Sequence, residues 1–152
     1  MAQQTIATAL KSRTAPVVTC RADDTIQLVI GLLDRHKIGA LPVTDGDGRL
    51  VGVISERDVI RALAANQGDV RALKVSELMT RDVVTCTRAT AVKDAARLMD
   101  TRHIRHLPVM EGSRVVDMVS LRDVVSLRLS EAELETGVLR DYARAVVGVS
   151  AN

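Results

Sequence analysis

Two four-residue segments carry the side chains best suited to chemistry in this sequence. Residues 55–58 (Ser-Glu-Arg-Asp) and 120–123 (Ser-Leu-Arg-Asp) each place a hydroxyl, a guanidinium and a carboxylate at the expected start of a helix. A helix N-terminus offers unpaired N–H groups and a positive dipole, which favour a phosphate, and arginine can neutralise that phosphate. The aspartate has the character needed to accept hydrogen bonds from two ribose hydroxyls. Each Ser-x-Arg-Asp segment therefore predicts part of a sugar-phosphate site.

A helix capping box is the simpler interpretation of the same residues. In that motif a serine and an acidic side chain three residues later tie off the start of a helix. Residues 130–133 (Ser-Glu-Ala-Glu) fit this pattern, and we interpret them as a capping box alone. Capping requires no arginine, however, whereas Arg57 and Arg122 recur with the serine and the aspartate. The repeated arginine favours ligand binding.

The two segments end the two copies of an internal repeat. Residues 17–59 begin Val-Val-Thr-Cys, continue through Leu-Pro-Val and reach Ser-x-Arg-Asp-Val, and residues 83–124 repeat that order. The offset is 66 residues up to Gly46 and Gly112 and 65 afterwards, because the second copy has lost one residue at a turn. Two copies of one unit usually pack face to face, so we expect two related sites at the seam.

Each copy predicts the element order β-α-β-β-α. A short β-branched run at 17–20 comes first, residues 41–44 and 50–54 flank an Asp-Gly-Asp-Gly turn as a hairpin, and a second helix starts near Asp58 or Asp123. The intervening helix has an apolar face, formed by Ile26, Val29, Ile30 and Leu33 in the first copy and by Val92, Ala95, Ala96 and Met99 in the second. The expected fold class is α+β, with two repeated motifs packed as a pseudo-two-fold pair and an extra C-terminal helix.

The expected boundaries follow from this pattern. Motif 1 spans 5–64, a linker around Gly68 spans 65–74, motif 2 spans 75–129, and a C-terminal helix and tail span 130–152. Residues 75–79 form a short lead-in that resembles residues 6–10. Apolar side chains form a stripe on the C-terminal helix that we expect to cover a lobe or a partner subunit: Leu134, Val138, Tyr142 and Ala145.

Composition narrows the choice of function. The chain has 152 residues, 47% of them hydrophobic, which suffices for one compact core built from two halves. A net charge of +2 implies neither a membrane nor a nucleic-acid partner, and the apolar runs are too short for a membrane span. Cys20 and Cys86 occupy matching positions without CxxC spacing, which favours reduced thiols in a cytoplasmic protein. One tyrosine and no other aromatic residue leave no platform for base stacking.

Metal and catalytic sites are weakly supported. The Asp-Gly-Asp-Gly turn hints at a calcium loop, but Arg49 and Leu50 occupy positions that require an oxygen ligand and a glycine. Neither cysteine has a neighbour that would activate it as a nucleophile. The potential zinc ligands match no known spacing: Cys20, Cys86, His36, His103 and His106. We therefore expect no metal, no catalytic residue and no enzymatic activity.

The order of these motifs resembles the cystathionine-β-synthase (CBS) domain. The resemblance rests on the Thr-containing strand start, the amphipathic helix, Ile-x-x-Leu-Pro-Val, the glycine-rich hairpin and the terminal Ser-x-x-Asp, and it covers both copies as one stand-alone tandem pair. It implies a regulatory, signal-transducing module that binds adenosine compounds such as AMP, ATP or NAD in two clefts. It also implies a homodimer of such pairs and no catalysis.

In that family each cleft combines the strand start and the pre-proline residues of one copy with the Ser-x-x-Asp of the other. The cleft called here the Asp123 cleft would then contain Thr19, Cys20, Ile38, Gly39, Ala40, Ser120, Arg122 and Asp123. The Asp58 cleft would contain Thr85, Cys86, Ile104, Arg105, His106, Ser55, Arg57 and Asp58. Because Arg105 and His106 add donors where Gly39 and Ala40 offer only backbone, we expect the Asp58 cleft to prefer the more highly charged ligand.

Two departures from the family pattern concern the clefts. The family often has proline where this chain has Ala22 and Arg88, and often has glycine near the end of the last strand. Gly52 keeps that glycine in the first copy, but the second copy has Asp117. Glycine lets a ligand approach the backbone closely, so Asp117 predicts a narrower or emptier Asp123 cleft.

Three classes of function remain open at this level. The first is an adenine-nucleotide sensor that acts on an effector protein through conformational or oligomeric change. The second is a ligand-independent oligomerisation module that dimerises through the helical faces around Ile26 and Val92. The third is a nucleic-acid binder that uses the 21 lysines and arginines, although the missing aromatic residues argue against it. The repeated Ser-x-Arg-Asp favours the sensor.

Overall fold

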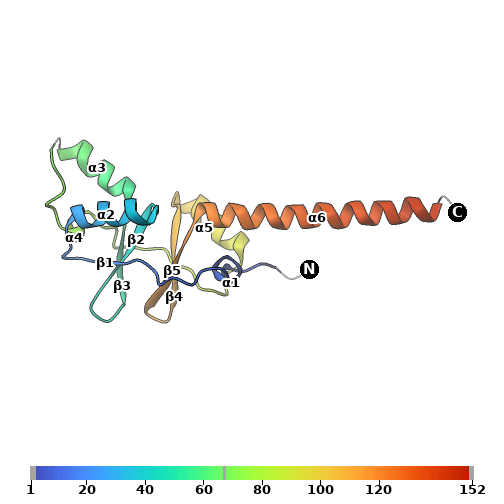
Figure 1. Cartoon of the computed structure of the whole chain (residues 1–152), viewed down its shortest axis with the longest axis horizontal. Coiled ribbons are helices and arrows are strands. Elements are labelled where there is room, and N and C mark those ends of the chain that lie inside the picture. The colour runs from blue at the N-terminus through green and yellow to red at the C-terminus, as the bar shows by residue number, and fades with distance from the viewer. Residues whose placement is uncertain (1–2, 67, 151–152) are drawn as a thin grey trace.

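The computed structural model describes residues 3–66 and 68–150, and it folds the chain into two small lobes from which one long helix extends (Figure 1). Gln67 of the expected linker and residues 151–152 of the expected tail lie outside the described residues. The first lobe contains β1 (Cys20–Arg21), α2 (Ile26–His36), β2 (Ala40–Thr44), β3 (Leu50–Ser55) and α3 (Glu56–Asn66). The second contains α5 (Val92–Arg102), β4 (His106–Glu111), β5 (Arg114–Ser120) and the start of α6 (Leu121–Ser150). The predicted α+β class and the pair of repeated motifs are confirmed.

Each lobe is built on an antiparallel hairpin. β2 pairs with β3 from Ala40 opposite Ser55, and β4 pairs with β5 from His106 opposite Ser120. Parallel pairing extends the first sheet by β1, whereas an isolated bridge joins Cys86 to Val109 in the second lobe. The prediction of a strand over 17–20 is therefore wrong for its first three residues. Among these three residues, Val18 packs against the first core without joining the sheet.

The amphipathic helices bury the faces that their spacing predicts. Ile26, Val29 and Leu33 of α2 are buried, and so are the corresponding residues of α5. Ile30 is the exception, because it lies at the solvent edge of the face. Both helices end at a left-handed residue with φ of 54°, Lys37 in the first copy and His103 in the second. The repeat is thus preserved at the level of backbone geometry.

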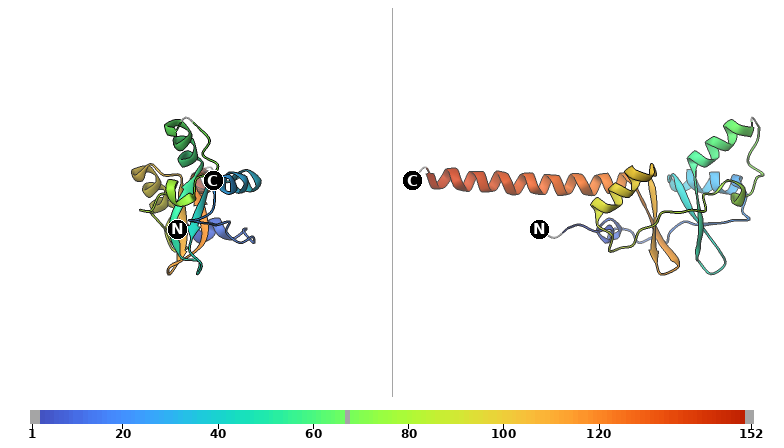
Figure 2. Two further views of the ribbon diagram at one scale, coloured as in Figure 1. Left: turned by 90° about the vertical axis from the view of Figure 1, so that its left-hand side faces the viewer. Right: turned by 180° about the vertical axis from the view of Figure 1, so that it is seen from behind.

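The two lead-in helices pack with the opposite halves of the chain. α1 (Ile6–Leu10) contributes Ile6 and Leu10 to the second hydrophobic core, whereas α4 (Val75–Leu78) contributes Val75 to the first. Figure 2 shows α1 beside the second lobe at the start of the chain. The expected motif 1 (5–64) is therefore contiguous in sequence but not in packing. The segment between α1 and β1 must cross the seam, and it carries Arg13 to β5.

The C-terminal helix does not begin where the sequence pattern indicates. α6 runs without interruption from Leu121 to Ser150, so Ser130 lies inside it and the prediction of a capping box at 130–133 is wrong. The distal part of α6 projects away from both lobes (Figures 1 and 2), and Leu134, Val138, Tyr142 and Ala145 are exposed. The expectation that this stripe covers a lobe of its own chain is therefore wrong. Among the described residues, no helix is both long and apolar enough to cross a membrane.

Candidate functional site

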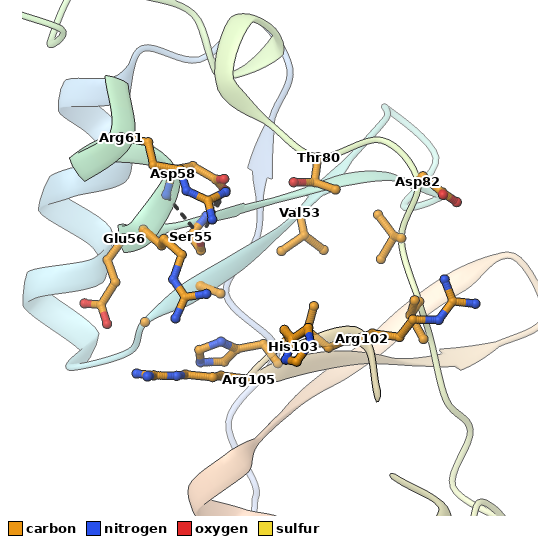
Figure 3. A pocket seen from close by; sticks show the side chains of 17 residues that line it. Val53, Ser55, Glu56, Asp58, Arg61, Thr80, Asp82, Arg102, His103 and Arg105 are labelled. Atoms are coloured by element: carbon orange, nitrogen blue, oxygen red, sulfur yellow. Dashed lines mark hydrogen bonds between the residues drawn. The ribbon is translucent and has the colours of Figure 1, made fainter. Parts of the chain in front are cut away.

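A cavity of about 390 Å3 lies at the seam between the lobes (Figure 3). The start of α3 forms one wall, and the end of α5 with the segment leading into β4 forms the opposite wall. Aliphatic side chains on its lining include Val53, Val83, Val84 and Ile104. The remaining lining is mostly polar or charged, so the cavity combines an apolar part with groups that can orient a small molecule.

The start of α3 presents Ser55 and Asp58 to this cavity through a reciprocal capping arrangement. The backbone N–H and the hydroxyl of Ser55 donate to Oδ2 of Asp58 at 2.8 and 3.0 Å, and the Asp58 N–H donates to Oγ of Ser55 at 3.3 Å. The capping interpretation is therefore correct for these two residues. Capping does not withdraw them from the cavity, because both line it together with Arg57. Among the described residues no other group donates to the Asp58 carboxylate.

Charged side chains of both signs line the cavity, with one more arginine than carboxylates. Its lining includes Arg57 and Arg61 from α3 and Arg102 and Arg105 from the opposite wall. Three carboxylates share the lining, those of Glu56, Asp58 and Asp82. Figure 3 shows Asp58 and Arg61 on one side and His103 and Arg105 on the other, so a molecule in the cavity would contact both lobes.

His106 adds a neutral donor or acceptor to this wall. Burial lowers the pKa of its imidazole below the ordinary value, and Arg105 lowers it further, against the opposing effects of Glu56 and Asp123. The imidazole is therefore uncharged at neutral pH. The positive charge of the opposite wall comes from the arginines.

Six of the eight residues assigned to the Asp58 cleft by sequence line the cavity: Ser55, Arg57, Asp58, Ile104, Arg105 and His106. Thr85 and Cys86 do not line it, and Cys86 lies in the second core instead. The residues two positions earlier, Val83 and Val84, take their place. Burial raises the pKa of the Cys86 thiol to about 11, so it remains a protonated core residue at neutral pH.

Gly39 and Ala40 also line this cavity, although the sequence placed them in the other cleft. The two pre-proline segments meet at the seam, where a Cβ atom added at Gly39 would lie 3.1 Å from Cε1 of His106. Both pre-proline segments therefore line the Asp58 cleft.

Besides Val83 and Val84, the lining residues that sequence reasoning missed are Val53, Glu56, Arg61, Thr80, Asp82, Arg102 and His103. Arg61 had a usable signal, because it lies one helical turn after Arg57 and so on the same face of α3. Arg102 and His103 end α5, and their place at the cavity depends on how the lobes pack together.

The Asp123 cleft has the same hydrogen bonds at its helix start, but here an arginine side chain binds the aspartate. Ser120 and Asp123 repeat the capping hydrogen bonds at 2.8, 3.0 and 3.2 Å. The guanidinium of Arg13 donates to Oδ2 of Asp123 at 2.5 Å, to Oδ1 of Asp117 at 2.9 Å and to the Met118 carbonyl at 2.6 Å. The cavity at the Asp58 cleft does not include the other residues assigned here, which are Thr19, Cys20, Ile38, Ser120, Arg122 and Asp123.

Two of the residues assigned to the Asp123 cleft belong to the first core. Cys20 is buried there and Ile38 packs against it. Burial, with a smaller contribution from Asp24, raises the pKa of the Cys20 thiol to about 12.

Within the described part of the chain, no three His, Cys, Asp or Glu side chains are grouped so that they could hold a metal ion.

The charges around Arg13 are coupled. Burial alone would raise the pKa of Asp123, but the Ser120 N–H and the Arg13 guanidinium outweigh burial and hold that pKa below its ordinary value. Burial likewise lowers the pKa of Arg13, and Asp123 and Asp117 more than reverse this effect. Arg13 is therefore a permanent cation bound to two carboxylates.

Comparison with known proteins identifies a matching family and similar structures. The CBS domain family model matches residues 9–65 and 75–130. The mitochondrial CBS domain-containing protein CBSX3 of Arabidopsis thaliana is 33% identical over 87% of this chain and 66% of its own length. The matched segment spans 35% and 22% of the lengths of two further curated relatives.

Two solved structures share the fold over nearly their whole length. The CBS-domain protein ATU1752 from Agrobacterium tumefaciens is 34% identical, with a TM-score of 0.77 over 83% of this chain and 94% of that one. The CBS domain pair of protein MJ0100 is 29% identical, with a TM-score of 0.76 over 86% and 99% of the two chains. MJ0100 was solved in complex with 5′-methylthioadenosine and S-adenosyl-L-methionine.

Replacing Arg13 should raise the pKa of Asp123. In the wild-type chain the ionised Asp123 contributes stability that is fully present above the ordinary aspartate pKa, about 4, and is lost as the pH falls through the depressed folded value. In Arg13→Met the folded pKa should lie higher, so less stability should be lost as the pH falls. Carbon-13 NMR titration of the Asp123 carboxyl and urea unfolding between pH 3 and 6 measure both effects.

The exposed Arg97 provides the control, since it pairs with Asp94 and does not contribute to the pKa shift of Asp123, so Arg97→Met should leave the Asp123 titration unchanged. An identical Asp123 titration in the wild type and in Arg13→Met would contradict this assignment.

Proposed function

The chain belongs to the CBS domain family, and we propose that it is an adenine-nucleotide sensor that binds its ligand in the Asp58 cleft. CBS domain pairs are regulatory modules. The observation that carries the proposal is the position of the Asp58 carboxylate on the cavity, opposite Arg105 and His106. A ligand bound in this cleft would contact both lobes.

The chemistry of the cavity fits an adenosine group. The Asp58 carboxylate is suited to accept hydrogen bonds from the two ribose hydroxyls, and the aliphatic part of the lining would pack against a planar base without aromatic stacking. A volume of about 390 Å3 lies within the usual range for small-molecule sites. The ligands bound by MJ0100 both contain adenosine, which supports this class of ligand.

The arginines favour a phosphorylated ligand. Neither 5′-methylthioadenosine nor S-adenosyl-L-methionine carries a phosphate, so the adenosine group alone does not require the cationic walls. Arg57 lies in the first turn of α3, where the helix dipole also favours an anion, Arg61 follows one turn later, and Arg105 lies on the opposite wall. We therefore favour AMP, ADP, ATP or NAD, and among these the more highly charged nucleotides.

Binding would regulate by changing how the lobes pack. A ligand that contacts α3 of the first lobe and the β4 segment of the second binds best to the arrangement in which both walls are correctly spaced, and so it shifts the population toward that arrangement. We propose that an effector protein recognises this change.

The buried, protonated thiols of Cys20 and Cys86 fit a reducing compartment such as the cytoplasm.

We also propose that two copies associate through α2, α3 and the first turns of α6. The faces around Ile26 and Val92 cannot form this interface, because both residues are fully buried, and that expectation is wrong. Exposed apolar residues lie elsewhere on the helices: Leu28, Ile60, Leu63, Val125 and Leu129. Ile60 and Val125 occupy matching positions in the two repeats, so each lobe contributes an exposed apolar residue that a second copy could cover.

Loss of the Asp58 carboxylate should abolish the response to nucleotides. Thermal shift and calorimetry with AMP, ADP, ATP, NAD and S-adenosylmethionine measure it, and a ligand at 100 times its dissociation constant should stabilise the wild-type chain by about 2.7 kcal/mol. In Asp58→Ala this stabilisation should disappear. Arg61→Ala and Arg105→Ala should weaken ATP binding more than AMP binding.

Asp123→Ala is the matched control for Asp58→Ala. Both substitutions remove the same capping hydrogen bonds from a helix start, so both should lower the melting temperature of the free chain. Only Asp58→Ala should lose the nucleotide-dependent shift. Retention of the shift in Asp58→Ala would overturn the assignment of the cleft.

Introducing a charge at the proposed dimer surface should separate the copies. Ile60 is 63% exposed, so Ile60→Glu should leave the monomer folded while it places a carboxylate inside the apolar interface. Sedimentation equilibrium should show a dimer for the wild type and a monomer for this variant. Ser113→Glu, in the exposed β4–β5 turn, should remain dimeric, and a monomeric wild type would refute the dimer.

A further inference from the structure

The two clefts differ in a pair of residues that pack against the last strand of each lobe. By the repeat offset Asp117 corresponds to Gly52 and Arg13 corresponds to Met79. In the first lobe a Cβ atom added at Gly52 would lie 2.9 Å from Sδ of Met79 and 2.9 Å from the Thr80 carbonyl, so this arrangement excludes a side chain at position 52. In the second lobe Arg13 and Asp117 form an ion pair of 2.9 Å at the corresponding place. A glycine–methionine contact in one lobe is thus an ion pair in the other.

The guanidinium of Arg13 also binds two residues whose counterparts in the Asp58 cleft line the cavity. It donates to Oδ2 of Asp123, the counterpart of Asp58, and to the carbonyl of Met118, the counterpart of Val53. Asp58 and Val53 both line the cavity. Arg13 therefore lies where a ligand in the Asp123 cleft would have to contact the protein.

This contact would be difficult for a ribose to displace. Arg13, Asp117 and Asp123 have side chains only 31%, 18% and 28% exposed, so their charges are partly shielded from water. The bonds from Arg13 are charge-assisted and stronger than those of a neutral hydroxyl. A ribose on Asp123 would also leave the half-buried Asp117 without its cation, at the cost of an unpaired charge.

We propose that Arg13 closes the Asp123 cleft to nucleotides, so that each chain binds one nucleotide, at the Asp58 cleft. This inference rests on the proposed function of the Asp58 cleft. It makes Arg13 a specificity-determining residue that acts by occupying Asp123.

The Asp123 cleft also has fewer arginines than the Asp58 cleft. The counterparts of Arg61, Arg102 and Arg105 are Ser126, His36 and Gly39, whereas Arg57 corresponds to Arg122 and His103 corresponds to the exposed Lys37. Once opened, this cleft should therefore gain less affinity from further phosphates than the Asp58 cleft does. The two clefts would then differ in ligand preference as well as in access.

The test removes Arg13 from the Asp123 cleft in a chain whose Asp58 cleft can no longer bind a nucleotide. The combined change Arg13→Met and Asp117→Gly installs the pair that the first lobe already accommodates, and Asp58→Ala removes the native site. Calorimetry with AMP and ATP should give one nucleotide per chain for the wild type, none for Asp58→Ala and one AMP per chain for the triple variant. Adding Asp123→Ala should abolish this regained binding.

Two controls secure the result. Asp58→Ala with Arg97→Met removes an exposed arginine outside both clefts and should not regain binding. Circular dichroism reports whether the triple variant folds. If it does not fold, Arg13→Gln in the Asp58→Ala background is the substitute, because it removes the charge but keeps an amide donor for the Met118 carbonyl, and it should regain AMP binding more weakly.

The outcomes separate this inference from the function on which it rests. Two nucleotides per wild-type chain, or no regained binding in a folded opened variant, would overturn the role of Arg13. A wild-type chain that binds nothing, with binding gained in the opened variant, would overturn the function proposed for the Asp58 cleft and support the role of Arg13. Absence of binding in every variant would overturn both.

Discussion

The reciprocal hydrogen bonding of serine and aspartate at the starts of α3 and α6 is the constraint on which the rest of the structure depends. It fixes each helix start against the strand before it, and it holds a carboxylate in one orientation at the seam of the lobes. The same bonds that stabilise the helix therefore pre-organise a group for recognition. Capping and ligand binding are not alternatives here, because Oδ2 of Asp58 accepts from Ser55 while the residue lines a cavity.

The repeat provides two such helix starts, but different residues surround them. The lead-in helices α1 and α4 cross to the opposite lobes, so the residues that follow them reach the last strand of the lobe they join. On one side Met79 fills the space above Gly52, and the neighbouring Asp58 remains accessible. On the other side Arg13 binds Asp117 and Asp123 together. The two repeats thereby form one arginine-lined cavity and one cleft whose carboxylates are paired with Arg13.

Local patterns predicted those parts of the molecule that local interactions determine. The spacing of Ile26, Val29 and Leu33 identified the buried helix face, and the glycine turn identified the hairpin, because each depends on neighbours in sequence. The crossing of the lead-ins, the continuity of α6 through Ser130 and the bonds from Arg13 to Asp117 and Asp123 were not predicted. Those bonds join residues 104 and 110 positions apart, and only tertiary packing decides them. The sequence did show Asp117 as a departure, but not the cation that accompanies it.

A crystal structure of the chain grown with ATP tests the central claim most directly. The account predicts a ribose on the Asp58 carboxylate, phosphates between Arg57 or Arg61 and Arg105, and Arg13 still bound to Asp123. Nucleotide on Asp123 with Arg13 displaced, while Asp58 bonds only to Ser55, would contradict it.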